Sequence, residues 1–300
     1  MAEVKEAKPK IIAVVGPTAC GKTQLAVKLA KKFQGEIVSA DSRQIYKGLD
    51  IGTGKDLALY GDTPYHLIDI VKPTRKFSLA QYQKKAYKAI STILSNNKLP
   101  IMCGGAGLYV KAVVRGLQLP QVKPDQKLRK KLEKATPEQR TAILEKYQAA
   151  DQIDLKNPHR VIRAIEICKA AGANFFKTKT RKNPQYRTLQ IGIKYSIDQI
   201  RARIKTRVNQ WLEQGLISEV KQLHDHGLSF KRLEELGLEY RYVSYFLDNK
   251  FDYQTMVDKL ITGTGQYAKK QITWFKKQKG IYWIKSPDKA EELVEQFLQK

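Results

Sequence analysis

The feature that most constrains this chain is a short glycine-containing turn between an apolar segment and a helix near its start. Residues 11–15 are all apolar, which predicts a buried strand, and residues 22–33 repeat apolar side chains at helical spacing. Between them, residues 16–23 read GPTACGKT and fit the pattern G-x-x-x-x-G-K-[ST]. In such a turn the backbone N–H groups, the positive end of the following helix and the lysine charge all face one anion. We interpret it as a loop that binds a di- or triphosphate; the alternative is an ordinary glycine turn that ends in Lys-Thr by chance.

Further strand and helix patterns follow this turn along the chain. Apolar runs predict strands at residues 36–40, 66–70, 99–103, 188–193 and 281–284, and helical spacing predicts helices at residues 78–96 and from residue 197. This alternation predicts an α/β fold, a P-loop NTPase-like parallel sheet flanked by helices. Between residues 119 and 187 strand patterns disappear, and basic, helix-forming sequence with several prolines takes over. We therefore expect a catalytic core of residues 1–118 and 188–300, interrupted by a helical insertion at residues 119–187.

Two further segments fall where a ligand of such a sheet would bind. Asp41 follows one predicted strand, and the glycine-rich residues 104–107 follow another. Ligands of open α/β sheets bind at the carboxyl ends of the strands, so both segments should converge on the phosphate loop. Asp41 could coordinate Mg²⁺ through water, accept a proton from a substrate nucleophile, or only cap its turn.

The charge balance of the chain predicts a large anionic partner. Lysine and arginine number 55 against 29 acidic residues, a formal net charge of +26. Such a surplus repels itself in a compact fold and favours nucleic acid as a partner, although a general lysine bias would give the same count. The three cysteines are widely spaced and suit a reducing cytosol rather than a zinc ribbon or a disulfide framework. No apolar run is long enough to span a membrane, so we expect a cytoplasmic protein with no membrane partner.

Three basic elements could meet a phosphate backbone. Asn157 is placed to cap a helix that carries Arg160 and Arg163 on one face, and residues 175–187 form a basic loop. Residues 267–277 predict an amphipathic helix with an apolar seam of Ala268, Ile272 and Phe275 and with lysines beside it. Solvated surface is the alternative for each element. The basic loop contains Lys177, Lys179, Arg181, Lys182 and Arg187.

Taken together, five blocks of the chain closely resemble the tRNA dimethylallyltransferase family. They are residues 16–23, 39–53, 104–109, 157–166 and 267–275, in the family's order. The phosphate loop is generic, but the block Asp-Ser-Arg-Gln-Ile-Tyr at residues 41–46 is specific to this family and its close relatives. The resemblance implies transfer of a dimethylallyl group from dimethylallyl diphosphate to N6 of the adenosine next to the anticodon, position 37, of a tRNA.

The resemblance also implies a role for each matched residue, with Mg²⁺ as the cofactor and Thr23 as its ligand. The implied catalytic residues are Asp41, Thr18, Lys22 and Arg207. The implied diphosphate- or nucleotide-binding residues are Gly16, Pro17, Thr18, Ala19, Cys20, Gly21, Lys22 and Thr23. The implied tRNA-binding residues are Asp41, Ser42, Arg43, Gln44, Ala106, His159, Arg160, Val161, Ile162 and Arg163.

The chain departs from the family pattern at three positions, and other functions remain open. Cys20 replaces a serine or glycine, Ala106 replaces a threonine whose hydroxyl is expected near the tRNA, and Gly54 replaces an alanine. The alternatives are prenyl transfer to free AMP, ADP or ATP, a small-metabolite kinase, and a nucleotide-gated RNA-binding protein. We expect a monomer whose partners are tRNA and dimethylallyl diphosphate.

Overall fold

The computed structural model of the chain describes residues 8–172 and 183–300. The chain divides into two compact units, one made of Met1–Val114 with Pro184–Lys300 and the other of Arg115–Asn183. The boundaries expected from the sequence were 119 and 187, against 115 and 183 for the division found in the structure. In the described part of the chain, no helix combines the length and the apolar character needed to cross a membrane.

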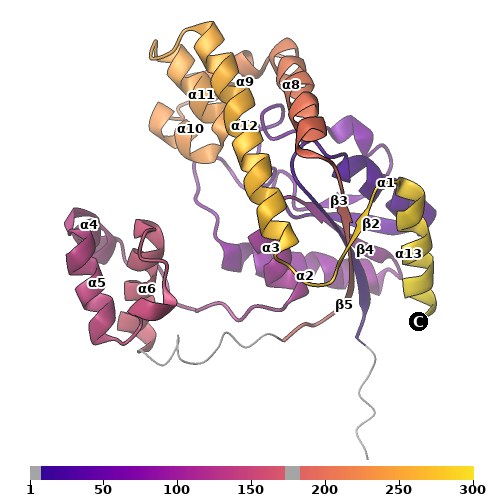
Figure 1. Cartoon of the computed structure of the whole chain (residues 1–300), viewed down its shortest axis with the longest axis horizontal. Helices are drawn as coiled ribbons and strands as arrows, with labels where there is room; N and C mark the ends of the chain where they lie inside the picture. The colour runs from indigo at the N-terminus through magenta and orange to yellow at the C-terminus, as the bar shows by residue number, and fades with distance from the viewer. Residues whose placement is uncertain (1–7, 173–182) are drawn as a thin grey trace, which may run out of the picture. The chain divides into compact units, whose positions relative to one another are not determined.

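The larger unit is built on one six-stranded parallel sheet in the order β3-β2-β4-β1-β5-β6 (Figure 1). The strands are β1 (Lys10–Val15), β2 (Gly35–Ser39), β3 (Tyr65–His66), β4 (Leu99–Gly104), β5 (Arg187–Ile193) and β6 (Ile281–Ile284). The α/β fold with a P-loop NTPase-like parallel sheet flanked by helices is thus confirmed. The expected strand at residues 66–70 is wrong beyond His66, because Leu67 and Asp69 adopt φ values of 66° and 56° that no strand accommodates.

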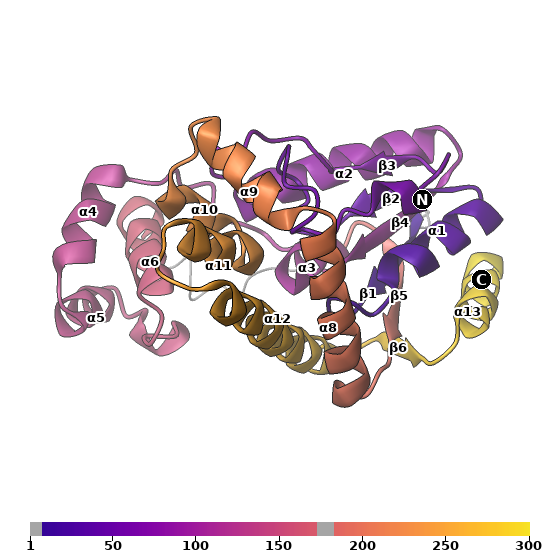
Figure 2. The same cartoon turned by 90° about the horizontal axis from the view of Figure 1, so that it is seen from above.

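Helices cover both faces of this sheet, which explains why its central strand is apolar throughout. On β1, Ile12 and Val14 pack against one helical layer. Ile11, Ala13 and Val15 pack against the layer on the opposite face. The first layer is α1 (Lys22–Lys32) and α13 (Pro287–Gln299), and the second is α2 (Leu79–Ser95) and α3 (Gly107–Val114). Figure 2 shows α13 beside α1, where Glu291 pairs with Lys28 and Lys32. The sequence did not predict α13.

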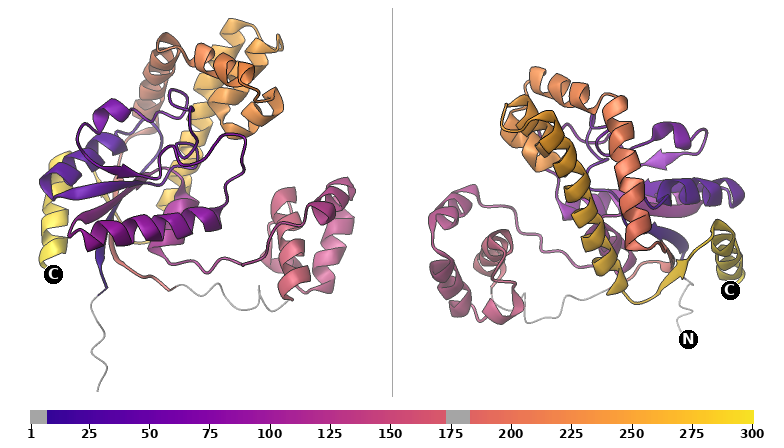
Figure 3. Two further views of the ribbon diagram at one scale, coloured as in Figure 1. Left: turned by 180° about the vertical axis from the view of Figure 1, so that it is seen from behind. Right: turned by 45° about the horizontal axis from the view of Figure 1, so that its top comes forward.

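A third group of helices lies over the edge of the sheet at which the phosphate loop emerges (Figure 3). Its members are α8 (Ile197–Glu213), α9 (Leu216–Asp225), α10 (Phe230–Leu236), α11 (Leu238–Leu247) and α12 (Tyr253–Lys276). Their buried side chains form one core cluster with Ala19 and Cys20 of the phosphate loop and with Ile45 and Leu49. This group of helices therefore packs against the phosphate loop at the point where the loop leaves the sheet. The helix expected at residues 267–277 is the last part of the much longer α12.

The smaller unit consists, in its described residues, of helices around a separate core. They are α4 (Gln126–Lys134), α5 (Pro137–Lys146), a short 3-10 turn (Ala150–Gln152) and α6 (Pro158–Ala171). Asn157 caps α6 by accepting the Arg160 N–H at 3.2 Å, as expected. Glu166 is buried on α6 and receives hydrogen bonds from Arg129 at 2.6 and 2.8 Å and from Arg163 at 3.0 Å.

Candidate active site

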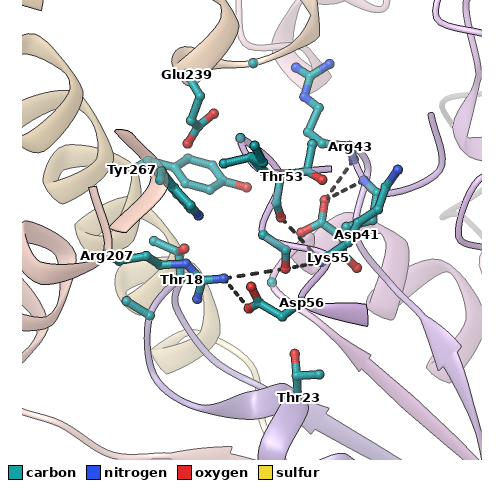
Figure 4. Close-up of a pocket in the computed structure, with 18 of the residues that line it drawn as sticks. Thr18, Thr23, Asp41, Arg43, Thr53, Lys55, Asp56, Arg207, Glu239 and Tyr267 are labelled. Carbon is teal, nitrogen blue, oxygen red and sulfur yellow. Dashed lines mark hydrogen bonds and ion pairs between the residues drawn. The ribbon is translucent and has the colours of Figure 1, made fainter. Parts of the chain in front are cut away.

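Three loops leave the same edge of the sheet at the same level. In the register of the strands, Val15 of β1 pairs with Gly104 of β4, and Ser39 of β2 pairs with Cys103 of β4. Since β2, β4 and β1 are neighbours, the phosphate loop, the segment at Asp41 and the 104–107 loop begin side by side. All three contribute to one cavity of about 1280 Å³ (Figure 4). The cavity lining includes four side chains that the sequence assigned to catalysis, those of Thr18, Lys22, Asp41 and Arg207.

The phosphate loop has the backbone geometry of an anion site. Helix α1 begins at Lys22, and its N-cap is Gly21 with φ 79°, so no side chain occupies the first free N–H groups. By contrast, Ser78 of α2 and Ser196 of α8 close their helices with capping boxes. The Lys22 ammonium donates to the Pro17 carbonyl and lies 3.8 Å from the Cys20 sulfur. The loop thus presents the first amides of α1 without a side-chain cap and, among the residues that the structure describes, a cation that contacts neutral acceptors.

Asp41 uses one carboxylate oxygen to hold its own turn. Its Oδ1 accepts the N–H of Arg43 at 2.8 Å and of Gln44 at 3.4 Å. Figure 4 shows its carboxylate among the residues that line the cavity, together with Thr18 and Thr23 from the phosphate loop. The capping role considered for Asp41 is therefore present, and it leaves the second oxygen facing the cavity side of the loop.

The neighbours of Asp41 are engaged with the protein itself. Gln44 accepts from the Ser39 hydroxyl at 3.0 Å and donates to the Gly54 carbonyl at 3.0 Å. Arg43 donates from Nη1 to the Glu235 carbonyl at 2.9 Å, at the end of α10. Ser42, Arg43 and Gln44 all line the cavity, but the Gln44 amide holds the opposite loop in place.

Two arginines reach the cavity from α8. Arg207 donates to the Asp56 carboxylate at 2.6 Å and stacks over the Trp211 ring, with 5.2 Å between guanidinium carbon and ring centre. A Cβ on residue 54 would lie 2.2 Å from the Arg207 guanidinium, so this rotamer requires Gly54, where an alanine was expected. Arg203, one turn earlier, donates from Nε to the Ala19 carbonyl at 2.7 Å. Arg203 was not among the residues to which the sequence analysis gave a role.

Residues 50–56 form the wall opposite α8, and they are held by groups that sequence reasoning missed. Lys55 is 1% exposed and donates to the Tyr46 carbonyl at 2.9 Å and to the carboxylates of Asp50 and Asp69. Glu219 of α9 accepts the backbone N–H groups of residues 50, 51 and 52 at 2.9, 2.8 and 3.3 Å. The family resemblance at residues 39–53 covers part of this wall, but it gave no role to Lys55 or Glu219.

Glu239 of α11 is another carboxyl group that lines the cavity. Burial raises its pKa to about 7, the nearby Asp41 charge acts in the same direction, and Arg43 and Arg207 oppose the rise. Figure 4 shows the Glu239 carboxyl beside the Tyr267 ring, away from Thr23. Asp41 and Glu239 therefore lie on the same cavity in different electrostatic surroundings.

The oxygen donors present would suit a magnesium ion that also binds a phosphate. No cluster of three or more histidine, cysteine or acidic residues in the described ranges could hold a metal by itself. The cavity does contain the Thr23 hydroxyl and the Asp41 carboxylate. Mg²⁺ commonly takes one or two protein oxygens and completes its shell with substrate phosphates and water, so this donor set fits it.

The residues expected to grip tRNA divide between the two units. His159 and Arg160 are exposed at the start of α6, whereas Val161 and Ile162 have side chains buried in the core of the smaller unit. Arg163 pairs with the buried Glu166 and also donates to the Val122 carbonyl at 2.7 Å.

The remaining expected RNA contacts lie elsewhere. Ala106 is half-buried beside the second helical layer, where its N–H donates to the Ala40 carbonyl at 3.2 Å. Lys177, Lys179, Arg181 and Lys182 lie outside the described residues. On α12, the predicted seam residue Ile272 is only half-buried, and the buried position next to it is Gln271.

Comparisons with known proteins identify the family of the chain. A family model described as IPP transferase matches residues 44–278, and one described as isopentenyl transferase matches residues 9–61. The chain is 46% identical to tRNA dimethylallyltransferase 2 of Shewanella sediminis, over 91% of this chain and 92% of that protein. It is 41% identical to tRNA dimethylallyltransferase of Treponema pallidum, over 91% of this chain and 90% of that protein.

The chain is also similar to solved structures of tRNA isopentenyl- and dimethylallyltransferases. The tRNA isopentenylpyrophosphate transferase of Bacillus halodurans superposes with a TM-score of 0.73 at 35% identity, covering 97% of this chain and 96% of that one. A eukaryotic dimethylallyltransferase acting on tRNA superposes with a TM-score of 0.81 at 26% identity, covering 92% of this chain and 74% of that one. With its phosphate loop, the Asp41 turn and the arginines of α8 on one cavity, this chain belongs to the IPP transferase family.

Proposed function

We propose that this chain transfers a dimethylallyl group from dimethylallyl diphosphate to N6 of the adenosine next to the anticodon, position 37, of a tRNA. The observation that carries the proposal is the placement of Asp41 and the phosphate loop on one cavity, at the ends of two strands that both pair with β4. The cavity, about 1280 Å³, exceeds the ~300–1,000 Å³ usual for a single small ligand, which suits a prenyl donor and a base together.

The phosphate loop would bind the leaving group. Breaking the allylic C–O bond transfers its electron pair to the diphosphate, while positive charge spreads over the allylic carbons. The amides at the start of α1, the Lys22 ammonium and the Arg207 guanidinium would offset the growing negative charge, and the Thr18 hydroxyl would donate to it. Only the backbone N–H of residue 20 is needed here, so Cys20 in place of serine or glycine leaves this arrangement intact.

Asp41 would act on the adenine, the nucleophile of the reaction. The adenine N6 attacks the allylic carbon, and the proton it then loses passes to the free oxygen of Asp41. The products are N6-dimethylallyl-adenosine and diphosphate. A magnesium ion held by Thr23 and the diphosphate would supply further charge neutralisation when bound.

The target base has to leave its stack to reach this cavity. Extruding a nucleotide costs a few kcal/mol of stacking, which contacts to the RNA backbone can offset. The net charge of +26 supports an RNA acceptor over a free nucleotide, because AMP or ATP needs no such surplus.

One labelling experiment tests the proposal. The protein is incubated with radiolabelled dimethylallyl diphosphate, Mg²⁺ and one of three acceptors: tRNA, the same tRNA with guanosine at position 37, or AMP. We expect label in the first RNA alone. Label in AMP at a comparable rate would favour the free-nucleotide reaction, and label in none of the acceptors would refute prenyl transfer.

A further inference from the structure

Gln271 of α12 links two loops that come from different strands. Its Oε1 accepts the backbone N–H of Thr18 at 2.8 Å, and its Nε2 donates to the Gly105 carbonyl at 3.0 Å. Gln271 is 6% exposed and lies 166 residues after Gly105 in the chain. Both ends of the amide are therefore used, one on the phosphate loop and one on the loop after β4.

The backbone around Gln271 is shaped to admit this side chain. A Cβ on residue 105 would lie 2.3 Å from the Gln271 Nε2, so only glycine fits there. The same Cβ would lie 3.2 Å from the Gly16 carbonyl, at the start of the phosphate loop. The 104–107 loop, the phosphate loop and the Gln271 amide thus pack closely together, and there is no room for a side chain on residue 105.

We propose that Gln271 is a positioning residue that turns the Thr18 N–H out of the anion site and closes the diphosphate loop against the 104–107 loop. The anion site then consists of the amides at residues 19–23, and Thr18 contributes its hydroxyl alone. The inference rests on the proposed function, since it assigns the loop to a diphosphate.

The physical reason lies in how the two loops are supported. Each continues a different strand, and hydrogen bonds between strands β1 and β4 end where the loops begin. Without Gln271, the Thr18 N–H would lose its acceptor and the buried Gly105 carbonyl would lose its donor, and the loops would turn to satisfy them. A shift of about 1 Å in a group that binds the leaving diphosphate costs on the order of 100-fold in rate.

The first test compares Gln271→Met with Gln278→Met. Methionine keeps the length of the side chain and removes both hydrogen bonds. Gln278 is a matched control, because it follows α12 and its amide bonds only the Trp274 carbonyl one turn earlier. Calorimetric titration measures the binding of inorganic pyrophosphate with Mg²⁺, and steady-state assays measure KM for each substrate.

For Gln271→Met we expect the pyrophosphate Kd and the KM for dimethylallyl diphosphate to rise together, about 10-fold or more. The KM for tRNA should stay within about twofold, and Gln278→Met should match the wild type. An unchanged pyrophosphate Kd would overturn the proposal, as would a loss of kcat that only follows a fall in Tm. The calorimetric measurement of pyrophosphate binding does not depend on turnover. It therefore still tests the role of Gln271 if the wild type transfers no label to tRNA.

A second variant separates positioning from simple packing. In Gln271→Glu, the ionised carboxylate accepts the Thr18 N–H but cannot donate to Gly105, whereas the protonated form can do both. Tyr267 is a titratable neighbour one turn earlier on α12, and burial raises its pKa to about 12, so it stays neutral below pH 9. We expect the ratio of the pyrophosphate Kd of this variant to that of the wild type to fall towards 1 as the pH is lowered from 8 to 5. A ratio that does not change with pH would contradict the role of the donated hydrogen bond.

Discussion

At the scale of single residues, Asp41 combines a turn cap and a proton acceptor on one carboxylate. Asp41→Asn keeps an oxygen for the Arg43 N–H but removes the base, so we expect kcat to fall about 10²–10⁴-fold. Pyrophosphate binding should stay within about threefold, because the phosphate loop is untouched. Single-turnover assays with labelled donor measure the first quantity, and calorimetry measures the second.

Comparison with Asp41→Ala separates the two roles of this residue. Alanine also removes the cap, which costs about 0.5–2 kcal/mol of stability, whereas asparagine should cost much less. Turnover of Asp41→Asn close to that of the wild type would remove Asp41 from the proton transfer.

Glu239 gives the free enzyme a pH-dependent stability of predictable sign. Burial raises its folded-state pKa to about 7, so between pH 4.5 and 7 the folded protein holds a proton that the unfolded chain releases. Its contribution to the free energy of unfolding therefore declines as pH rises through this window, and above pH 7 the buried charge is a full penalty.

We expect Glu239→Gln to be more stable than the wild type at pH 8.5, by about 1–3 kcal/mol, and nearly equal to it at pH 5. Urea denaturation at the two pH values measures the difference. A gain in stability that is the same at both values would show that the Glu239 carboxyl does not titrate between them.

At the scale of secondary-structure elements, Glu219 decides whether the cavity wall at residues 50–56 keeps its shape. Its carboxylate collects three backbone N–H groups and the Tyr240 hydroxyl, the latter at 2.7 Å. Glu219→Ala leaves these donors without an acceptor, so we expect a loss of about 2–4 kcal/mol in the free energy of unfolding.

The control for Glu219 is Glu213→Ala, an exposed position at the end of α8, which should change stability by less than about 0.5 kcal/mol. Residues 50–56 also contain the Gly54 carbonyl and the Asp56 carboxylate that accept hydrogen bonds from Arg207. The KM for dimethylallyl diphosphate should therefore rise in Glu219→Ala and stay unchanged in Glu213→Ala. Equal denaturation midpoints for Glu219→Ala and the wild type would contradict the structural role of this carboxylate.

Elements with strong local signals were predictable, and weakly patterned ones were not. The strand before the phosphate loop has five consecutive apolar residues, and α1 after it has a clear helical repeat. Asn157 caps α6 as expected. The third strand was overestimated because positive φ values at Leu67 and Asp69 end it, and neither residue type signals that conformation. Helix α13 was not predicted, although its buried residues Ala290 and Val294 lie four apart, at helical spacing.

At the scale of the whole molecule, Arg160 tests the smaller unit as an RNA-binding element. Its guanidinium is 67% exposed at the start of α6 and pairs with the exposed Asp154. Arg160→Glu should weaken tRNA binding and lower the slope of log K against log salt by about 1–2. Lys130→Glu, an equal charge change on an exposed position of α4, controls for net charge, and filter binding at several salt concentrations measures both.

Arg163 is unsuited to this test because it belongs to the core of the smaller unit. Burial of Glu166 would raise its pKa, but hydrogen bonds from Arg129, Arg163 and the Asp125 N–H outweigh this effect and lower the pKa to about 2. An acidic side chain at position 163 would therefore disturb the fold rather than an RNA contact. Equal salt slopes for Arg160→Glu and Lys130→Glu would show that α6 has no particular part in RNA binding.

By itself, the sequence determined the phosphate loop, the parallel sheet and the family resemblance, because these depend on backbone conformation and periodicity within short stretches. Only the tertiary structure decided which polar side chains are free for substrate. Gln44 and Arg163 matched the expected pattern yet bond to the protein itself, and Gln271 joins Thr18 to Gly105 although nothing in its neighbourhood marks it. Such contacts link residues far apart in the chain, so they depend on strand order and helix packing, which local patterns do not encode.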